Sequence, residues 1–162
     1  MRDVVARAIA EPGALMKTLG EPRRAGIQTL HRSPELTVLN LVWGPGMSVT
    51  PHNHEMWAVI GIYDGREDNI FWRRLPGDAR GRIEAAGASA LSERDVQPLG
   101  RDIIHSVLNP VRRCTGALHV YGGDFFGAAR SEWDCATLVE QPFDVERTLA
   151  LFAESNRLHA SD

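Results

Sequence analysis

The chain has 162 residues, of which 43% are hydrophobic and 24% charged, and its formal net charge is −3. This length corresponds to one domain, and the composition is that of an ordinary globular protein. The small negative charge argues against nucleic acid or an anionic membrane as a partner. No apolar run approaches the roughly 20 residues that span a bilayer, and the N-terminus lacks an apolar signal segment. The two cysteines, Cys114 and Cys135, have no metal-binding spacing, so we expect free thiols and a cytoplasmic protein.

The N-terminal residues predict helices. Apolar residues recur at helical spacing from Val4 to Leu19, and Gly20 ends the pattern. Pro12 and Gly13 are expected to divide this segment into two short helices. We assign residues 1–34 to this helical segment and to the lead-in that follows it.

The middle of the chain, residues 35–125, predicts a β-barrel built from short strands. Runs rich in β-branched and aromatic residues favour strands, and Asp64-Gly65 is typical of a tight turn between two of them. The segment 75–87 carries three glycines and is expected to be a loop with a short strand inside it. The expected strands cover residues 36–43, 56–63, 68–74, 89–92, 103–108 and 116–121.

Residues 126–162 predict a C-terminal segment with one helix. Asp144 is suited to an N-cap, and Val145, Leu149 and Phe152 follow at amphipathic spacing. Many short strands with helices only at the two ends favour an all-β fold, a small antiparallel barrel or jelly roll. The mouth of such a barrel can hold one metal ion and one small ligand.

Two histidines separated by one residue predict a metal site. Residues i and i+2 of a strand point to the same face, so His52 and His54 can aim both imidazoles at one point, whereas Asn53 and Glu55 point away. A metal ion needs this convergence and a hydrophobic core does not. His105, in the apolar segment 103–108, is the candidate third ligand. Taken alone, a histidine in a strand is more often a hydrogen-bonded core residue.

Several short motifs resemble those of the cupin superfamily, and more specifically those of the bacterial thiol dioxygenases, the cysteine and 3-mercaptopropionate dioxygenase family. The resemblance implies that residues 1–162 form a single cupin domain, a double-stranded β-helix or jelly-roll barrel with flanking N- and C-terminal helices. It also implies a mononuclear Fe(II) centre. The matching pieces, in the family's order, are Val42-Trp43-Gly44-Pro45-Gly46, Pro51-His52-Asn53-His54, Trp57-Ala58-Val59-Ile60-Gly61, His105-Ser106-Val107-Leu108-Asn109 and His119-Val120-Tyr121-Gly122-Gly123.

The resemblance assigns the metal and the groups beside it. It implies that Fe(II) is held by His52, His54 and His105, a ligand set that can also carry Zn(II) or Ni(II) in purified protein. It further implies that His119 and Tyr121 belong to a hydrogen-bonded relay beside the iron. On a strand these two residues share a face with position 117. The family has a serine at that position, and this chain has an alanine.

Two further residues are candidates for binding the substrate. Gln28 lies about where the 3-mercaptopropionate branch carries a glutamine, and Arg130, nine residues after Tyr121, matches an arginine of the family. A guanidinium pairs with a carboxylate through two parallel hydrogen bonds. An isolated arginine is also common as a solvated surface charge, so that interpretation stays open.

The implied activity is oxidation of a small thiol, of the 3-mercaptopropionate or cysteine type, to a sulfinate with O₂. Three neutral imidazoles leave a ferrous ion with a charge of about +2, which favours an anionic ligand and lowers the pKa of a bound thiol. Two alternatives stay open: a three-histidine cupin acting on a non-thiol small molecule, and a non-enzymatic ligand-binding cupin. The expected partners are the small thiol carboxylate and O₂. Association with a second copy of the chain as a homodimer is a further possibility that the sequence leaves open.

Overall fold

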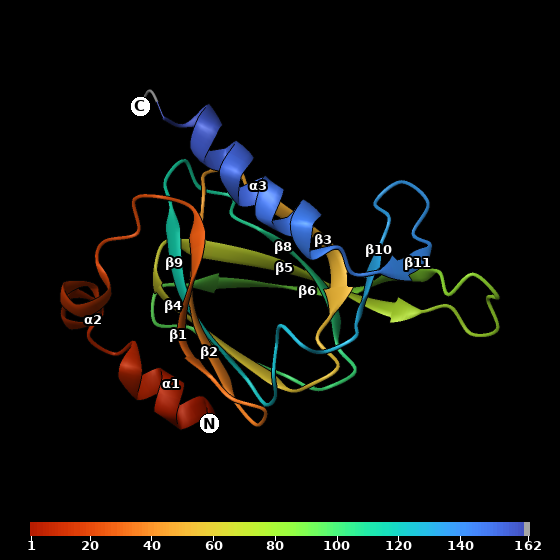
Figure 1. Ribbon diagram of the computed structural model, residues 1–162, viewed down its shortest axis with the longest axis horizontal. Helices are drawn as coiled ribbons and strands as arrows, with labels where there is room; N and C mark the ends of the chain where they lie inside the picture. The colour runs from red at the N-terminus through yellow and green to blue at the C-terminus, as the bar shows by residue number, and fades with distance from the viewer. Residues whose placement is uncertain (161–162) are drawn as a thin grey trace.

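The computed structural model describes residues 1–160 and shows two antiparallel β-sheets that face each other, with helices contributed by the two ends of the chain (Figure 1). The five-stranded sheet has the order β1 (Gly26–Arg32), β2 (Thr37–Trp43), β9 (Thr115–Tyr121), β4 (Ala58–Asp64) and β7 (Val96–Leu99). The six-stranded sheet has the order β11 (Glu140–Pro142), β10 (Ser131–Trp133), β3 (Ser48–Asn53), β8 (Ile104–Leu108), β5 (Arg66–Arg74) and β6 (Ile83–Ser92). The predicted all-β jelly-roll barrel with terminal helices is confirmed.

The main core lies between the two sheets and explains the nearly unbroken apolar sequences of β4 and β9. Inward side chains such as Leu39, Ile60 and Val107 pack together there. The outward side chains of β4 and β9 are buried as well, because the N-terminal helices cover that face. A strand that is buried on both faces is expected to be apolar throughout rather than alternating.

Two short helices, α1 (Arg2–Ala8) and α2 (Pro12–Leu19), cover the outer face of the five-stranded sheet. Pro12 occupies the first turn of α2, where its missing N–H is not needed, and Gly20 ends the helix at φ +87°. The predicted division at Pro12 is therefore confirmed. Helix α1 approaches β4 closely at Gly61, since a Cβ atom there would lie 2.5 Å from Val5 Cγ1.

The sheets extend beyond the predicted barrel boundaries of 35–125. Strand β1 lies inside the segment expected to be helix and lead-in, and β10 and β11 lie inside the C-terminal segment. β1 and β11 are edge strands, and β1 is mostly exposed and polar, so it lacks the apolar alternation on which strand prediction depends. Strand β6 is also longer than predicted because its small Ala, Gly and Ser residues give little hydrophobic pattern.

Helix α3 (Val145–Leu158) closes one side of the barrel and is drawn in blue along the top of Figure 1. The predicted N-cap is confirmed, because the Asp144 carboxylate accepts a hydrogen bond from the backbone N–H of Arg147 at 2.9 Å. Phe152 stacks on Trp43 with ring centroids 5.5 Å apart. The Asn156 amide pairs with the backbone of Ala25 in both directions at 2.8 Å. Within residues 1–160, none of the helices has the length and apolar character needed to cross a membrane.

Candidate metal centre

Three buried histidines converge at one end of the core between the sheets. Antiparallel pairing of β3 with β8 sets His52 directly opposite His105, and His54 follows β3 by one residue. The Nε2 atom of His54 lies 3.2 Å from His52 Nε2 and 3.3 Å from His105 Nε2. The prediction that these three imidazoles meet is confirmed. Glu55, which turns the chain away at φ +57°, is exposed and pairs with Asn53 outside the cluster.

Hydrogen bonds on the outer side of two of the three imidazoles fix which ring nitrogen carries the proton. His52 Nδ1 lies 2.9 Å from the Thr50 carbonyl, and His105 Nδ1 lies 2.7 Å from the Asn69 amide oxygen. Because both partners are acceptors, each Nδ1 carries the proton and each Nε2 presents a lone pair. Both lone pairs lie close to His54 Nε2, at 3.2 and 3.3 Å, and a proton on that nitrogen could satisfy only one of them, whereas a cation would satisfy both. This donor arrangement therefore fits a metal ion.

The spacing also fits a metal ion. Nitrogens about 2.1 Å from an ion are about 3.0 Å apart at adjacent octahedral positions and slightly further apart in a tetrahedron. The observed 3.2 and 3.3 Å agree with either geometry. Burial lowers the pKa of His52 to about 4 and the pKa values of His54 and His105 well below their ordinary value. The imidazoles are therefore neutral at pH 7, as metal ligands must be.

His119 and Tyr121 lie beside this cluster on β9, as predicted. His119 Nδ1 is 3.0 Å from the Tyr121 hydroxyl, and the Tyr121 ring packs edge-on against His54 with centroids 5.0 Å apart. Burial raises the pKa of Tyr121 well above its ordinary value of 10, so the phenol keeps its proton. His119 Nε2 is buried and has no hydrogen-bond partner among the described residues.

A second pair of polar residues, which the sequence analysis missed, lies behind the histidines. Glu67 and Asn69 are fully buried on β5 and point inward. Glu67 accepts hydrogen bonds from Trp43 Nε1 at 2.7 Å and from Asn69 Nδ2 at 2.9 Å. Their i, i+2 spacing was the available signal, but Asn69 lies at the start of the expected strand 68–74 and Glu67 lies between that strand and the Asp64-Gly65 turn, where polar residues are ordinarily solvated.

Arg130 reaches the same pocket from the segment before β10. Its guanidinium lies between the rings of Phe125 and Phe143, 3.9 Å from each centroid. Its buried Nη1 has no hydrogen-bond partner among the described residues. Burial lowers the pKa of Arg130 to about 10, so it stays charged at pH 7. Arg130 therefore brings an unpaired positive charge next to the histidines.

Gln28, in contrast, is not brought to the pocket. It lies on β1 opposite Asn40, and its side-chain oxygen accepts a hydrogen bond from Asn40 Nδ2 at 3.1 Å on the outer face of the sheet. The adjacent residue, Ile27, lines the pocket instead. Successive side chains of a strand point to opposite faces, so a shift of one position separates Gln28 from the predicted site.

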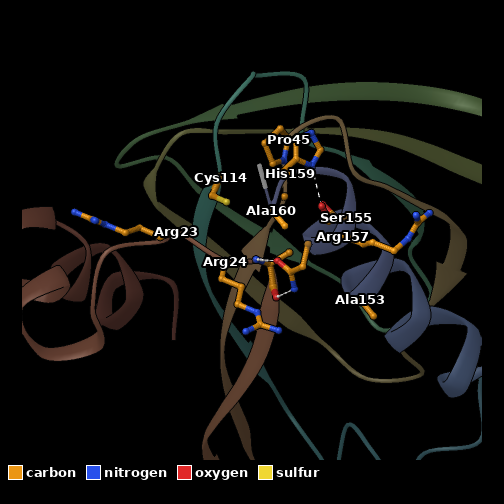
Figure 2. Close-up of a pocket in the computed structure, with 12 residues that line it drawn as sticks. Arg23, Arg24, Pro45, Cys114, Ala153, Ser155, Arg157, His159 and Ala160 are labelled. Atoms are coloured by element: carbon orange, nitrogen blue, oxygen red, sulfur yellow. Dashed lines mark hydrogen bonds between the residues drawn. The ribbon is translucent and has the colours of Figure 1, made fainter. Parts of the chain in front are cut away.

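The enclosed cavity at the histidines has a volume of about 40 Å³. Apolar side chains form most of its wall, among them Phe125, Phe143 and Phe152. A wider groove of about 510 Å³ lies at the C-terminal end of α3 (Figure 2). There, Arg23 and Arg157 point in different directions and are paired with nearby glutamates. The histidine cavity is the better candidate site.

Comparisons with known proteins identify the fold. No family model matches the chain. An RmlC-like cupin family protein with a double-stranded β-helix fold from Methanocaldococcus jannaschii superimposes with a TM-score of 0.52 and 10% identity, covering 64% of this chain and 84% of that one. A cupin superfamily protein from Desulfitobacterium hafniense superimposes with a TM-score of 0.50 and 16% identity, covering 66% and 86%. The chain thus has the double-stranded β-helix fold of the cupins.

Proposed function

We propose that this cupin-fold protein is a non-haem Fe(II)-dependent thiol dioxygenase that oxidises a small thiol carboxylate, of the 3-mercaptopropionate or cysteine type, to a sulfinate. One observation carries the proposal: three neutral imidazoles and the unpaired guanidinium of Arg130 border the same cavity. The balanced reaction is R–SH + O₂ → R–SO₂H. Both oxygen atoms end on sulfur, so no further reductant is required.

The charges in the pocket favour a doubly negative ligand. A divalent ion at three neutral histidines keeps about two positive charges. Arg130 adds one positive charge and the buried Glu67 removes one, which leaves about +2 in an apolar enclosure. A thiolate carboxylate carries two negative charges and neutralises this excess. A neutral or singly charged ligand would leave buried charge uncompensated.

Different residues of the pocket would act on different parts of the substrate. Fe(II), when bound, would supply the redox chemistry that joins dioxygen to sulfur. Arg130 would bind the carboxylate through its free Nη1 and fix the distance between carboxylate and sulfur. Tyr121, which stays protonated, offers a hydroxyl group beside the histidines. The aromatic wall around Phe125 and Phe143 excludes bulk water, which strengthens each of these polar interactions.

The size of the cavity sets a condition on substrate binding. About 40 Å³ is room for about one water molecule, less than a thiol carboxylate needs. Arg130 lines this cavity and also an open outer groove beside Glu140 and Pro142. The wall that includes Arg130 and Phe143 must therefore move when the substrate enters from that side.

A second candidate is a three-histidine, metal-dependent enzyme acting on a non-thiol carboxylate. Ala117 favours it, because the serine hydroxyl of the thiol dioxygenase relay is missing on this face of β9. The charge argument applies equally to a substrate that presents a carboxylate and a second ionisable oxygen. The two candidates differ only in the atom that meets the metal.

Oxygen uptake with matched ligands tests both candidates. Protein loaded anaerobically with one equivalent of Fe(II) is mixed with O₂ and 3-mercaptopropionate, cysteine or 3-hydroxypropionate, the last replacing sulfur by oxygen. We expect uptake only with a thiol, one sulfinate per O₂, and both labelled atoms in the product from ¹⁸O₂. Uptake with the hydroxy acid alone would support the second candidate. No uptake by fully loaded protein with any thiol carboxylate would refute the first.

A further inference from the structure

The carboxylate of Glu67 lies between the three-histidine cluster on one side and His119 on the other. On one side, its Oε1 accepts from Asn69 Nδ2 at 2.9 Å, and Asn69 Oδ1 in turn meets His105 Nδ1 at 2.7 Å. On the other side, its Oε2 is 3.6 Å from His119 Nε2. Glu67 therefore connects the candidate metal ligand His105 to the His119–Tyr121 pair. Every member of this chain is buried.

The orientation of Asn69 follows from Glu67. A carboxylate only accepts hydrogen bonds, so Asn69 must turn its NH₂ group toward Glu67 and its oxygen toward His105. His105 Nδ1 must then donate, and Nε2 is left unprotonated for a metal ion. The hydrogen-bond polarity of three residues thus decides whether the third imidazole can bind a metal ion.

The same carboxylate is the charged group that faces His119. The 3.6 Å separation is longer than a hydrogen bond but close enough for a negative charge to favour a proton on Nε2. With that proton in place, Nδ1 accepts from the Tyr121 hydroxyl at 3.0 Å. Ala117, on the same face of β9, offers no hydroxyl to do this.

We propose that Glu67 is a positioning residue that holds His105 with its proton on Nδ1 and His119 with its proton on Nε2. This inference rests on the metal site of the proposed function but not on the identity of the substrate. The Glu67 carboxylate does not line the cavity at the histidines, and its hydrogen bonds run to Trp43 and Asn69 rather than to a candidate metal ligand. It acts through Asn69 on one side and through His119 on the other.

Replacing Glu67 by glutamine has a specific predicted effect because Trp43 Nε1 can only donate. In Glu67→Gln the amide oxygen must face Trp43, so the new NH₂ group faces Asn69. Asn69 then turns its oxygen to residue 67 and its NH₂ to His105. The His105 proton moves to Nε2, where it blocks the metal position. The added change Asn69→Asp restores an acceptor for both neighbours, and with it the metal-binding tautomer.

Two measurements test this inference without thiol or oxygen. Two-bond ¹H–¹⁵N spectra of the metal-free protein report the tautomer of each imidazole. Competition with a chelating dye reports the affinity for Zn(II). We expect Glu67→Gln to weaken Zn(II) binding about 10- to 100-fold, the usual cost of losing an outer hydrogen-bond partner. We expect the double variant Glu67→Gln/Asn69→Asp to recover most of that loss. Asp68→Asn, which removes the same charge from the outward face of β5, is the matched control and should not change the affinity.

The outcomes separate this inference from the thiol chemistry. A wild-type spectrum with the His105 proton on Nε2, or the His119 proton on Nδ1, overturns the corresponding half of the proposal. Unchanged Zn(II) affinity in Glu67→Gln, or no recovery in a folded double variant, overturns the tautomer mechanism. If Glu67→Gln does not fold, the wild-type spectrum decides. Failed oxygen uptake would reject the proposed reaction but would not affect the conclusions from the tautomer spectra and the Zn(II) affinities.

Discussion

His52 and His105 face each other as register partners of the β3–β8 pair, with ring centroids 4.6 Å apart. Backbone hydrogen bonds between these two strands therefore set the distance between two of the three candidate ligands. A slip of one residue in this pairing would turn one imidazole to the opposite face. The geometry of the metal site is thus a consequence of strand register.

Removal of one imidazole is expected to abolish stable metal binding. In His105→Ala, two ligands remain and the polar partner Asn69 loses its donor. Zn(II) affinity should fall by more than the roughly 100-fold that the loss of an outer partner can cost. Metal analysis after dialysis and dye competition measure this change. His31→Ala, which changes an exposed histidine on β1, should retain wild-type affinity. Equal affinity in both variants would show that the ion binds elsewhere.

The metal-free protein is expected to lose stability on mild acidification. Burial lowers the pKa of His52 from 6.5 to about 4 in the folded state. Between these values the unfolded chain binds more protons than the folded chain, so the free energy of unfolding falls as the pH falls. The contribution is complete above pH 6.5, and for His52 it amounts to about 3 kcal/mol. Urea unfolding in a chelator at pH 7.5 and pH 5 measures it. His52→Gln should show a smaller pH dependence, whereas an equal slope in the variant would contradict this assignment.

Arg130→Met is expected to separate carboxylate binding from stability. The methionine keeps an apolar side chain between Phe125 and Phe143 but removes the charge. The KM for 3-mercaptopropionate should rise about 100-fold, as expected for losing one partner of a buried charge pair. Turnover of 2-mercaptoethanol, whose thiolate carries one negative charge and no carboxylate, should not fall, because the pocket without Arg130 keeps about one positive charge.

Stability supplies the second readout for this variant. The cost of the buried, unpaired Nη1 and the two cation–π contacts of Arg130 oppose each other, so Arg130→Met should change the free energy of unfolding by no more than about 1 kcal/mol. Chemical denaturation measures this difference. A loss of several kcal/mol would show that Arg130 is chiefly a structural residue and would contradict its assignment to the substrate carboxylate.

The outer face of the five-stranded sheet offers a packing test. A Cβ atom on Gly116 would overlap the ring of Tyr63, which is fully buried and donates to Asn40 Oδ1 at 2.8 Å. Gly116→Ala should therefore lower the free energy of unfolding by about 1–3 kcal/mol. Gly26→Ala is the control, because a Cβ atom there meets nothing within 4 Å, and its effect should stay within about 0.5 kcal/mol. Thermal or urea unfolding of both variants measures these changes, and equal free energies of unfolding for the two variants would contradict the prediction.

The parts of this molecule that could be predicted from sequence are those with a strong local signal. Pro12 and Gly20 bound a helix through backbone restrictions, and the N-cap at Asp144 needs only its own side chain. The convergence of His52 and His54 follows from strand parity alone. His105 lies far away in sequence, and it was found because its apolar segment and the family resemblance pointed to the same residue.

The parts that could not be predicted depend on partners distant in the chain. Glu67 and Asn69 follow a turn, where polar residues are ordinarily solvated, and only the folded sheet shows that they are buried beneath Trp43. Gln28 was assigned by its position relative to the family, and this position was one residue away from the side chain that faces inward. Edge strand β1 carries almost no apolar alternation.

Helix α3 has a consequence for how an ion would leave the protein. All three candidate ligands precede residue 106, whereas Phe143, Thr148 and Phe152 complete the wall in front of them. Without the docked helix, Thr148 and Phe152 would no longer cover this side of the cavity. Detachment of this single element costs less than global unfolding. The rate of ion dissociation should therefore follow the rate of hydrogen exchange of the α3 amides. Loss of the stacking contact between Phe152 and Trp43 should accelerate both processes.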